Sequence, residues 1–416
     1  MSYVADLHLH SPYAYATSRS LTLENLAHWA QLKGIDLLAS ADFTHPVWFR
    51  ELREKLVEVA PGTYQYQGVH FILGTEVSCV YSQSGRQRRL HLLLFAPNFD
   101  TVARINQALA PHGNLFSDGR PTLRLSARDL TALVLEINSE CIVIPAHVWT
   151  PWYGVYGSKS GFDTLQECFQ DLMPHIQAVE TGLSSDPAMN WGVPELADKC
   201  ILSFSDAHSL PKLAREVTVF QGELSYSQFS QAVAQNQVAY TAEFYPEEGK
   251  YHYNGHRKCN VHQSPVETLR EGSRCPVCNR PMTLGVLHQV SLLSGNTVEF
   301  VPDSDGFIHP PDGRPPFLRL VPLQELIAET LGQGVGTRRV QNEYQRLVQE
   351  LGGELEILIR ANSADLEQAA GRELARAILQ ARRGQVVVEP GYDGVFGKIS
   401  VPPVALQGTL PGIEGD

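Results

Sequence analysis

The sequence predicts an α/β protein in which a β/α barrel is followed by a cysteine-rich segment and a smaller region of mixed helices and strands. Over residues 1–220, short apolar runs alternate with amphipathic helical patterns. This periodicity ends near Tyr245, and helical patterns return after a proline-rich stretch at 302–322. Strands that alternate with helices indicate parallel β/α units, and about seven or eight such units in one domain favour a barrel. We therefore expect three domains, at 1–240, 241–300 and 301–416.

The composition is that of an ordinary globular protein. Of 416 residues, 43% are hydrophobic and 19% are charged, which is too apolar for a disordered chain. No stretch approaches the ~20 apolar residues of a membrane span, and the start lacks the features of a signal peptide, so we expect a cytoplasmic protein without a membrane partner. The formal net charge of −12 argues by itself against a nucleic-acid partner, because phosphate binding favours basic surface.

The first helix is predicted at 22–33, where apolar residues from Leu23 to Ala30 keep helical spacing. Thr22 can cap its start and Gly34 can end it. After the first strand, further barrel strands are predicted at 35–41, 69–73, 90–95, 141–145, 176–179, 201–204 and 216–220.

Histidines and acidic residues lie at the ends of these apolar runs. His8 and His10 close the first strand, and His91 opens the run at 90–95. The others each follow a run, and they are Asp42, Glu76, His147, Asp206 and His208. In a β/α barrel, functional residues collect at the carboxyl ends of the strands. We therefore expect four imidazoles and two or three carboxylates to converge at one mouth.

This mixture of imidazoles and carboxylates suits Zn²⁺, Mn²⁺ or Fe²⁺, and more than one ion if a carboxylate bridges. A single His-x-His pair would be weak evidence, because a lone histidine is more often a core residue. Six or seven such residues, each at the end of a separate run, favour a metal site.

The motifs at these positions resemble those of the PHP (polymerase and histidinol phosphatase) superfamily. They read Asp6-Leu-His8-Leu-His10-Ser, Gly74-Thr-Glu76, Leu90-His91-Leu, Pro145-Ala-His147 and Ser205-Asp206-Ala-His208. The resemblance implies a distorted β/α barrel that hydrolyses phosphoesters with a metal cluster, in which ions activate water and stabilise charge on the leaving oxygen. It implies one ion held by His8, His10, Glu76 and Asp206, and a second held by Glu76, His91 and His147.

The sequence departs from the family at the second motif, which reads Asp42-Phe43 in place of Asp-His, with His45 two residues further on. A third ion, to which His208 would contribute, is therefore in doubt, and Asp42 and His45 are secondary ligand candidates. We expect two divalent ions (Zn, Mn or Mg), with Asp206, Glu76 and His208 as the catalytic residues.

The seven cysteines divide into two kinds. Cys79, Cys141, Cys168 and Cys200 are scattered in apolar contexts and are expected to be buried thiols. Cys275 and Cys278 have zinc-knuckle spacing, and Cys259 lies upstream of them. A histidine must complete a tetrahedral structural zinc site, and His256 is best placed, with His252 and His262 as alternatives.

The C-terminal region contains two predicted helices, at 323–331 and 338–351, joined by a glycine-rich turn. The turn resembles the hairpin of a helix–hairpin–helix, in which Gly334 and Gly336 would let backbone N–H groups approach a phosphate beside Arg338 and Arg339. A glycine-rich helix end is the equal alternative. Strands at 354–359 and 385–389 are expected to flank a helix at 365–383.

The order of these parts resembles the endonuclease Q family. The motifs that carry the resemblance lie at 16–18, 42–46, 180–191, 249–259, 275–278, 332–340 and 390–397. It implies a repair endonuclease that nicks double- or single-stranded DNA on the 5′ side of a deaminated base (uracil, hypoxanthine or xanthine) or an abasic site. The protein would then be cytoplasmic in a prokaryote and associated with the nucleoid when on DNA. A sliding clamp is a further expected partner, although no clear clamp-binding motif is present.

A damaged base must leave the stack to be read. Candidate residues for its pocket are Tyr13, Trp149, Ser184 and Asn190, with further aromatic residues near the mouth at Tyr15, Phe43, Trp152, Tyr153 and Trp191. Arg86, Arg88 and Arg89 precede His91 and could reach flanking phosphates, although a solvated hairpin is the simpler interpretation. Basic residues also surround the cysteines, which predicts a local basic track on an acidic protein.

Two other functions are compatible with the sequence. The first is a PHP-type phosphatase for a small phosphomonoester, which would leave the zinc site and the glycine hairpin without a role. The second is a nucleic-acid-binding protein with an inactive barrel, against which stands the full set of metal-ligand candidates.

Overall fold

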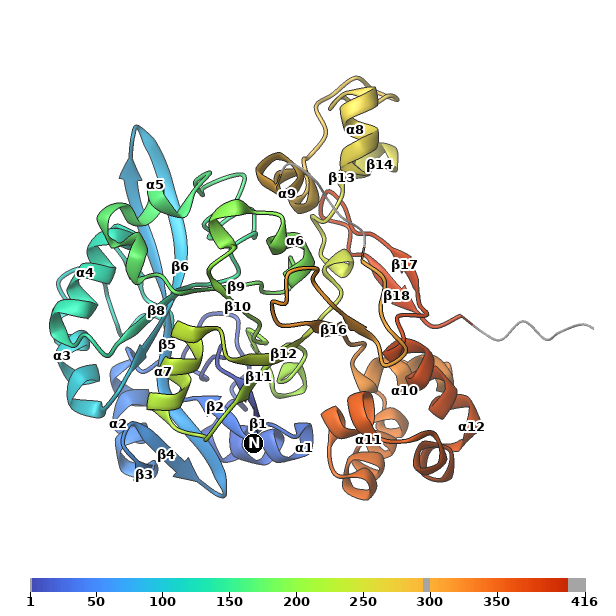
Figure 1. Cartoon of the computed structure of the whole chain (residues 1–416), viewed down its shortest axis with the longest axis horizontal. Helices are drawn as coiled ribbons and strands as arrows, with labels where there is room; N and C mark the ends of the chain where they lie inside the picture. The colour runs from blue at the N-terminus through green and yellow to red at the C-terminus, as the bar shows by residue number, and fades with distance from the viewer. Residues whose placement is uncertain (1, 295–299, 403–416) are drawn as a thin grey trace, which may run out of the picture.

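The computed structural model describes residues 2–294 and 300–402. Figure 1 shows a barrel on the left of the view, with a cysteine-rich region at the upper right and C-terminal helices at the lower right. No helix in the described part of the chain is long and apolar enough to cross a membrane. The α/β class and the distorted barrel are confirmed.

The barrel strands are β1 (Ser2–Asp6), β2 (Leu37–Ala39), β5 (Val69–Gln83), β6 (Arg86–Ala96), β8 (Ile142–Pro145), β9 (Ala178–Glu180), β10 (Cys200–Leu202) and β11 (Val217–Gln221). β1 is parallel to β2 and β2 to β5, but β6 is antiparallel to both β5 and β8, and β11 is antiparallel to β1. Side chains and loops complete the ring, because Val148 N donates to Glu180 O (3.0 Å) and Thr218 Oγ1 bonds to the backbone of Ser203. The expectation of purely parallel units is therefore wrong for β6 and β11.

Helices cover the outside of the barrel. They are α1 (Leu23–Lys33), α2 (Pro46–Lys55), α3 (Phe99–Leu109), α4 (Ala127–Ile137), α5 (Leu165–Phe169), α6 (Pro187–Trp191) and α7 (Tyr226–Gln235). The predicted ends of α1 are confirmed, because Thr22 Oγ1 accepts from Asn25 N and Gly34 adopts φ +83°. Short strands β3 (Val57–Ala60), β4 (Thr63–Tyr66) and β7 (Thr122–Leu123) add to the β5 edge.

The barrel sheet continues into the later parts of the chain. β12 (Val238–Glu243) pairs with β11, β16 (Phe317–Arg319) pairs with β12, and β15 (Phe307–Ile308) pairs with β16. The sheet thus includes strands on both sides of positions 240 and 300, where we expect domain boundaries. The division into three domains stays a prediction. The segment between β12 and β15 contains β13 (Asn254–His256), β14 (Val261–Gln263), α8 (Pro265–Glu271) and α9 (Val286–Ser294).

The C-terminal region consists of α10 (Leu323–Leu331), α11 (Arg338–Leu351) and α12 (Ser363–Arg382), followed by the hairpin of β17 (Val387–Glu389) and β18 (Lys398–Ser400). The strand expected at 354–359 is wrong, because the chain forms a π-helical turn at Glu356–Arg360. This turn buries Ile357 and Leu358 in the helical core. A short apolar run does not distinguish a buried turn of helix from a buried strand.

A buried ion pair joins the barrel to the C-terminal helices. Lys33 Nζ in α1 lies 2.5 Å from Glu354 Oε2, and both side chains are almost fully buried. The other partners of Glu354 are Tyr344 Oη and the backbone N of Leu323, which both donate to it. Removal of one partner leaves an uncompensated charge, so this contact is the polar anchor of the helices on the barrel.

We expect Lys33→Met to lower the free energy of unfolding by about 3–5 kcal/mol, because it leaves the Glu354 carboxylate buried without its cation. Urea denaturation followed by tryptophan fluorescence measures the change. The control is Lys212→Met, which removes an exposed pair with Glu325 (3.6 Å) and should cost about 0–1 kcal/mol. Equal losses in the two variants would contradict the anchoring role.

Candidate metal centre

One group of four expected ligands meets at the barrel mouth. The Nε2 atoms of His8 and His10 lie 3.5 and 3.4 Å from Glu76 Oε2, and 3.4 and 3.1 Å from Asp206 Oδ1. The ligand atoms of the four residues all lie within 4.8 Å of one another. His8 Nε2 is buried without a hydrogen-bond partner, so a nitrogen lone pair can face the space between the carboxylates. This donor set fits a divalent cation.

A second group shares Glu76 with the first. Glu76 Oε1 lies 2.6 Å from His91 Nδ1 and 3.1 Å from His147 Nε2, and these two ring nitrogens are 3.1 Å apart. Glu76 therefore directs one carboxylate oxygen at each group. This is the geometry of a carboxylate that bridges two cations.

Each ligand is placed by a strand or by the turn that follows it. His8 and His10 follow β1, where Leu9 pairs with Ala207, while Glu76 lies within β5. His91 lies in the middle of β6, which runs antiparallel to β5.

The turns that carry His147 and Asp206 are strained. His147 and Asp206 adopt φ of +31° and +46°, in the left-handed region that side chains with a Cβ seldom occupy. Gly182 packs against the first of these turns so closely that a Cβ on it would lie 2.3 Å from the Cβ of His147. Such local strain commonly accompanies functional sites.

Two further carboxylates orient the histidines from behind. Glu180 Oε1 lies 2.8 Å from His8 Nδ1, and its Oε2 accepts from the backbone N of His147 (2.7 Å). Asp42 Oδ1 lies 3.1 Å from His10 Nδ1. Carboxylates in this position fix the tautomer of a ligating histidine and increase its basicity.

These contacts correct the roles that we expect for Asp42 and His45. Asp42 belongs to neither ligand group, because it orients His10, and its other oxygen accepts from Ser11 N (2.6 Å). The ring of His45 stacks on Tyr13 at 4.3 Å between centroids and is also outside both groups. Glu180 is a residue that sequence reasoning missed, although it follows the apolar run at 176–179 as Glu76 follows its own.

Arg120 is a second residue that sequence reasoning missed. Its Nη1 lies 3.0 Å from Glu76 Oε2, so a guanidinium reaches into the centre from the loop before β7. Asp118 Oδ1 holds this loop, because it accepts from the backbone N of both Arg120 and Tyr15. No strand precedes Arg120 in the sequence pattern, and no signal there marks it.

The charges of the centre favour cations. Burial acts to lower the pKa of His8, but Glu180, Glu76 and Asp206 outweigh it and raise this pKa well above its usual value. Burial acts to raise the pKa of Glu76, but His91 and Arg120 outweigh it and hold this pKa well below its usual value. The Glu76 carboxylate is therefore ionised, and a metal ion would replace the proton of His8.

His208 lies at the edge of the centre. Its side chain is 32% exposed, its Nδ1 bonds to the backbone O of Asp206 (2.9 Å), and its ring lies edge-on to His10 at 4.6 Å. It belongs to neither ligand group. Its position is open to substrate on one side and in contact with a ligand on the other.

The cysteine-rich region forms a separate group of possible ligands. Cys259, Cys275, Cys278 and His256 place their ligand atoms within 4.8 Å of one another. The alternatives are elsewhere, since His252 is buried beside Tyr253 and His262 packs against Tyr392. Burial acts to raise the pKa of Cys275, but the backbone N–H groups of Cys278 and Val277 outweigh it and bring this pKa to about 6. A thiolate at neutral pH suits zinc.

Two of the expected base-pocket residues are hydrogen-bonded to each other inside the protein. Trp149 and Asn190 are both buried, and Trp149 Nε1 donates to Asn190 Oδ1 (2.8 Å). Asn190 uses its amide N on Asp186 O, so its hydrogen-bonding groups are already paired. Tyr13 and Ser184 are half-buried and stay candidates.

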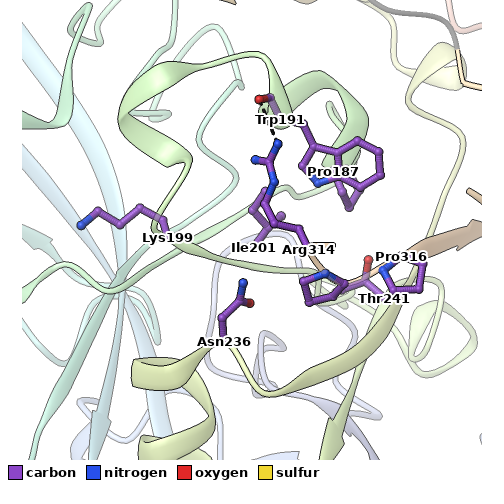
Figure 2. Close-up of a pocket in the computed structure, with 9 residues that line it drawn as sticks. Pro187, Trp191, Lys199, Ile201, Asn236, Thr241, Arg314 and Pro316 are labelled. Carbon is purple, nitrogen blue, oxygen red and sulfur yellow. Dashed lines mark hydrogen bonds between the residues drawn. The ribbon is translucent and has the colours of Figure 1, made fainter. Parts of the chain in front are cut away.

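The other aromatic candidates differ in position. Phe43 is buried, Tyr153 packs on His91 at 4.3 Å, and Tyr15 and Trp152 are exposed. Figure 2 shows Trp191 in a different pocket, where Arg314 donates to its backbone O, so it does not line the mouth.

The basic candidates also divide. Arg88 is buried, donates to Gly161 O and lies over the ring of Phe162, so it does not reach phosphates. Of the other two, Arg86 is exposed at the start of β6 and Arg89 is half-buried. The glycine-rich turn joins α10 and α11, and its Gly334 and Gly336 are exposed, as are Arg338 and Arg339.

The chain is similar in sequence to one family model and to two bacterial or archaeal proteins. A family model described as the MJ0043 C-terminal domain matches residues 322–385. MJ0043 of Methanocaldococcus jannaschii is 33% identical over 267 residues, which are 62% of this chain and 32% of MJ0043. The match thus spans about a third of that relative. YqxK of Bacillus subtilis is 28% identical over 418 residues, which cover 95% of this chain and 98% of YqxK.

Two solved structures match nearly the whole chain. The lesion-specific endonuclease PfuEndoQ from Pyrococcus furiosus has a TM-score of 0.84 and 29% identity, over 97% of this chain and 96% of that one. An endonuclease Q complex with a 27-mer duplex that has an abasic lesion at the active site has a TM-score of 0.83 and 29% identity, over 97% of each chain. The fold is a distorted β/α barrel with two groups of possible metal ligands at its mouth. Over nearly its whole length, the chain is therefore similar to endonuclease Q structures.

We expect Glu180→Gln to weaken divalent-metal binding at the barrel mouth about 10–100-fold, because the amide no longer holds His8 as a carboxylate does. Calorimetric titration of the metal-free protein with Mn²⁺ measures the affinity. The matched control is Glu195→Gln, which changes a half-buried carboxylate that accepts from Tyr156 Oη outside the centre. An unchanged Mn²⁺ affinity in Glu180→Gln would refute the orienting role.

At the cysteine group, we expect His256→Gln to lower the zinc content of the purified full-length protein, because three thiolates alone leave a tetrahedral site incomplete. Atomic emission spectroscopy measures zinc per chain. His252→Gln is the control and should keep its zinc. Zinc loss in the control but not in His256→Gln would reverse the choice of ligand.

Proposed function

We propose that this protein is a metal-dependent DNA endonuclease of base-damage repair. It hydrolyses the phosphodiester on the 5′ side of a deaminated base (uracil, hypoxanthine or xanthine) or an abasic site. The observation that carries the proposal is the pair of ligand groups sharing Glu76, in a chain that matches an endonuclease Q–DNA complex over 97% of its length.

The two ligand groups would hold two divalent ions. Ions at this pair of positions supply an activated water and stabilise the charge that develops on the phosphate and the leaving oxygen. Their number and identity are part of the proposal, as is a structural zinc at His256, Cys259, Cys275 and Cys278. Glu180 and Asp42 keep the rings of His8 and His10 in the orientation that ligation requires.

In this proposal, the guanidinium of Arg120 binds the phosphate of the DNA during the reaction. Its guanidinium is held at Glu76 by a loop whose backbone is fixed by Asp118. Cations beside Glu76 would compete with Arg120 for the same carboxylate and leave its donors free for the oxygens of a phosphate. A planar guanidinium matches these oxygens with two hydrogen bonds.

The damaged nucleotide would leave the stack and enter the mouth, where Tyr13 and Ser184 stand as half-buried candidates for contact with the base. Weakly paired lesions cost least to extrude, which supports selectivity for them. His208 contacts His10 and is partly exposed, so it is placed to exchange a proton with the substrate side.

The test uses duplex DNA with one deoxyuridine, one deoxyinosine or one abasic site, incubated with Mg²⁺, Mn²⁺ or Zn²⁺. We expect a single nick 5′ to the lesion and none in undamaged duplex. Asp206→Asn should cut at least ~10³-fold more slowly while still binding DNA, because it removes a ligand to the ion that stabilises charge. Arg120→Ala should slow the nick without weakening metal binding, because it removes a cation that competes for Glu76.

The proposal would be contradicted if no nick formed with any of the three metals while a small phosphomonoester was hydrolysed rapidly. That result would favour the phosphatase. Full activity of Asp206→Asn would refute the ligand assignment, whatever the substrate.

A further inference from the structure

Four residues form a partly exposed strip beside the metal centre, which we call the aromatic ridge (Trp152, Lys250, Tyr251 and Phe396). The rings of Trp152 and Tyr251 meet edge to face, with centroids 5.7 Å apart. Lys250 Nζ lies 5.8 Å from the centroid of Tyr251 and 5.6 Å from that of Phe396. Phe396 is 73% exposed and Trp152 is 42% exposed, so the ridge faces solvent.

The ridge is built from three distant parts of the chain, and two of them are hydrogen-bonded to each other. The turn that carries Phe396 is hydrogen-bonded to the segment before β13. Its bonds run from Gly391 N to Glu247 O, from Gly394 N to Lys250 O, from Gly397 N to Glu248 O and from Tyr253 N to Gly391 O, at 2.8 to 3.0 Å. Four such bonds over so short a segment indicate a fixed surface.

The ridge starts next to the metal centre. Tyr153, the neighbour of Trp152, packs on His91 at 4.3 Å, and its backbone O accepts from His91 N (2.9 Å). The other end lies beside the cysteine-rich region, since Arg257 N donates to Asp393 Oδ2 (2.8 Å) and its guanidinium lies against Gly394. The ridge therefore has a contact of the metal centre next to one end and a contact of the cysteine-rich region next to the other.

Its chemistry fits unpaired nucleotides. Exposed aromatic faces offer stacking platforms to bases of any sequence, and cations next to them bind the phosphates between those bases. A paired duplex keeps its bases stacked on each other and offers these rings only its backbone.

We propose that the aromatic ridge binds unpaired nucleotides of the strand that enters the metal centre, so that this strand is separated from its complement on that side of the lesion. This inference rests on the proposed endonuclease function, which supplies the nucleic acid. It assigns to Trp152 and Phe396 stacking contacts and to Lys250 a phosphate contact.

The test measures binding of full-length variants to a single-stranded oligo(dT) 20-mer and to an undamaged blunt duplex of equal length, by fluorescence anisotropy. Trp152→Ala and Phe396→Ala should each weaken single-strand binding about tenfold, and change duplex binding less than twofold. For single-strand binding, Lys250→Ala should reduce the slope of log K against log salt concentration by an amount that corresponds to about one phosphate contact. Trp152→Phe should keep most of the affinity.

The matched control is Arg53→Ala, which removes a cation that lies 5.7 Å over the ring of Phe49 on α2, outside the ridge. It should bind both DNAs as the unmodified protein does. Thermal melting by circular dichroism and Mn²⁺ affinity confirm that each variant is folded with its centre intact.

The outcomes separate this inference from the proposed function. Unchanged single-strand binding in the ridge variants, or no binding of oligo(dT) by the unmodified protein, overturns the ridge even if lesion duplexes are nicked. Equal losses for single strand and duplex also overturn it, in favour of a duplex-backbone contact. A selective loss in the single strand supports the ridge even if no lesion is nicked, in which case only the endonuclease proposal fails.

Discussion

The structure is organised around one buried carboxylate, that of Glu76. An ionised carboxylate with no solvent exposure costs several kcal/mol to bury unless cations and hydrogen-bond donors surround it. Here the partners are His8 and His10 on one oxygen and His91 and His147 on the other, with Arg120 beside them. They come from separate strands and loops. The carboxylate is compensated only when the barrel has closed.

The distortions of the barrel follow from the same requirement. β6 runs antiparallel to β5, and His91 in the middle of β6 still meets Glu76. The turn at His147 adopts a left-handed backbone conformation and lies against a glycine, and Glu180 binds both that turn and His8. Strain and second carboxylates together hold the imidazoles where a cation can use them.

The net charge of −12 changes meaning once the charges are placed. Part of the acidity is inside the protein, at carboxylates such as Glu76, Glu180 and Asp42 that face histidines. Several cations lie outside, at the glycine-rich turn and on the aromatic ridge. Buried Arg88 shows that a cluster of arginines in sequence is not necessarily a basic surface. Distribution, and not the sum, decides whether a phosphate is attracted.

What the sequence determined by itself was the class of fold, the ends of the first helix and the residues that meet at the mouth, because periodicity and the carboxyl ends of strands are local properties. It did not reveal that Asp42 orients His10 and that Glu180 orients His8. In the sequence, a carboxylate that follows a strand looks the same whether it binds a metal or orients a histidine. Arg120, the π-helical turn at Glu356–Arg360 and the satisfied pair of Trp149 with Asn190 were also beyond it. These were decided by tertiary structure alone, because burial and hydrogen-bond partners depend on which distant segments pack together.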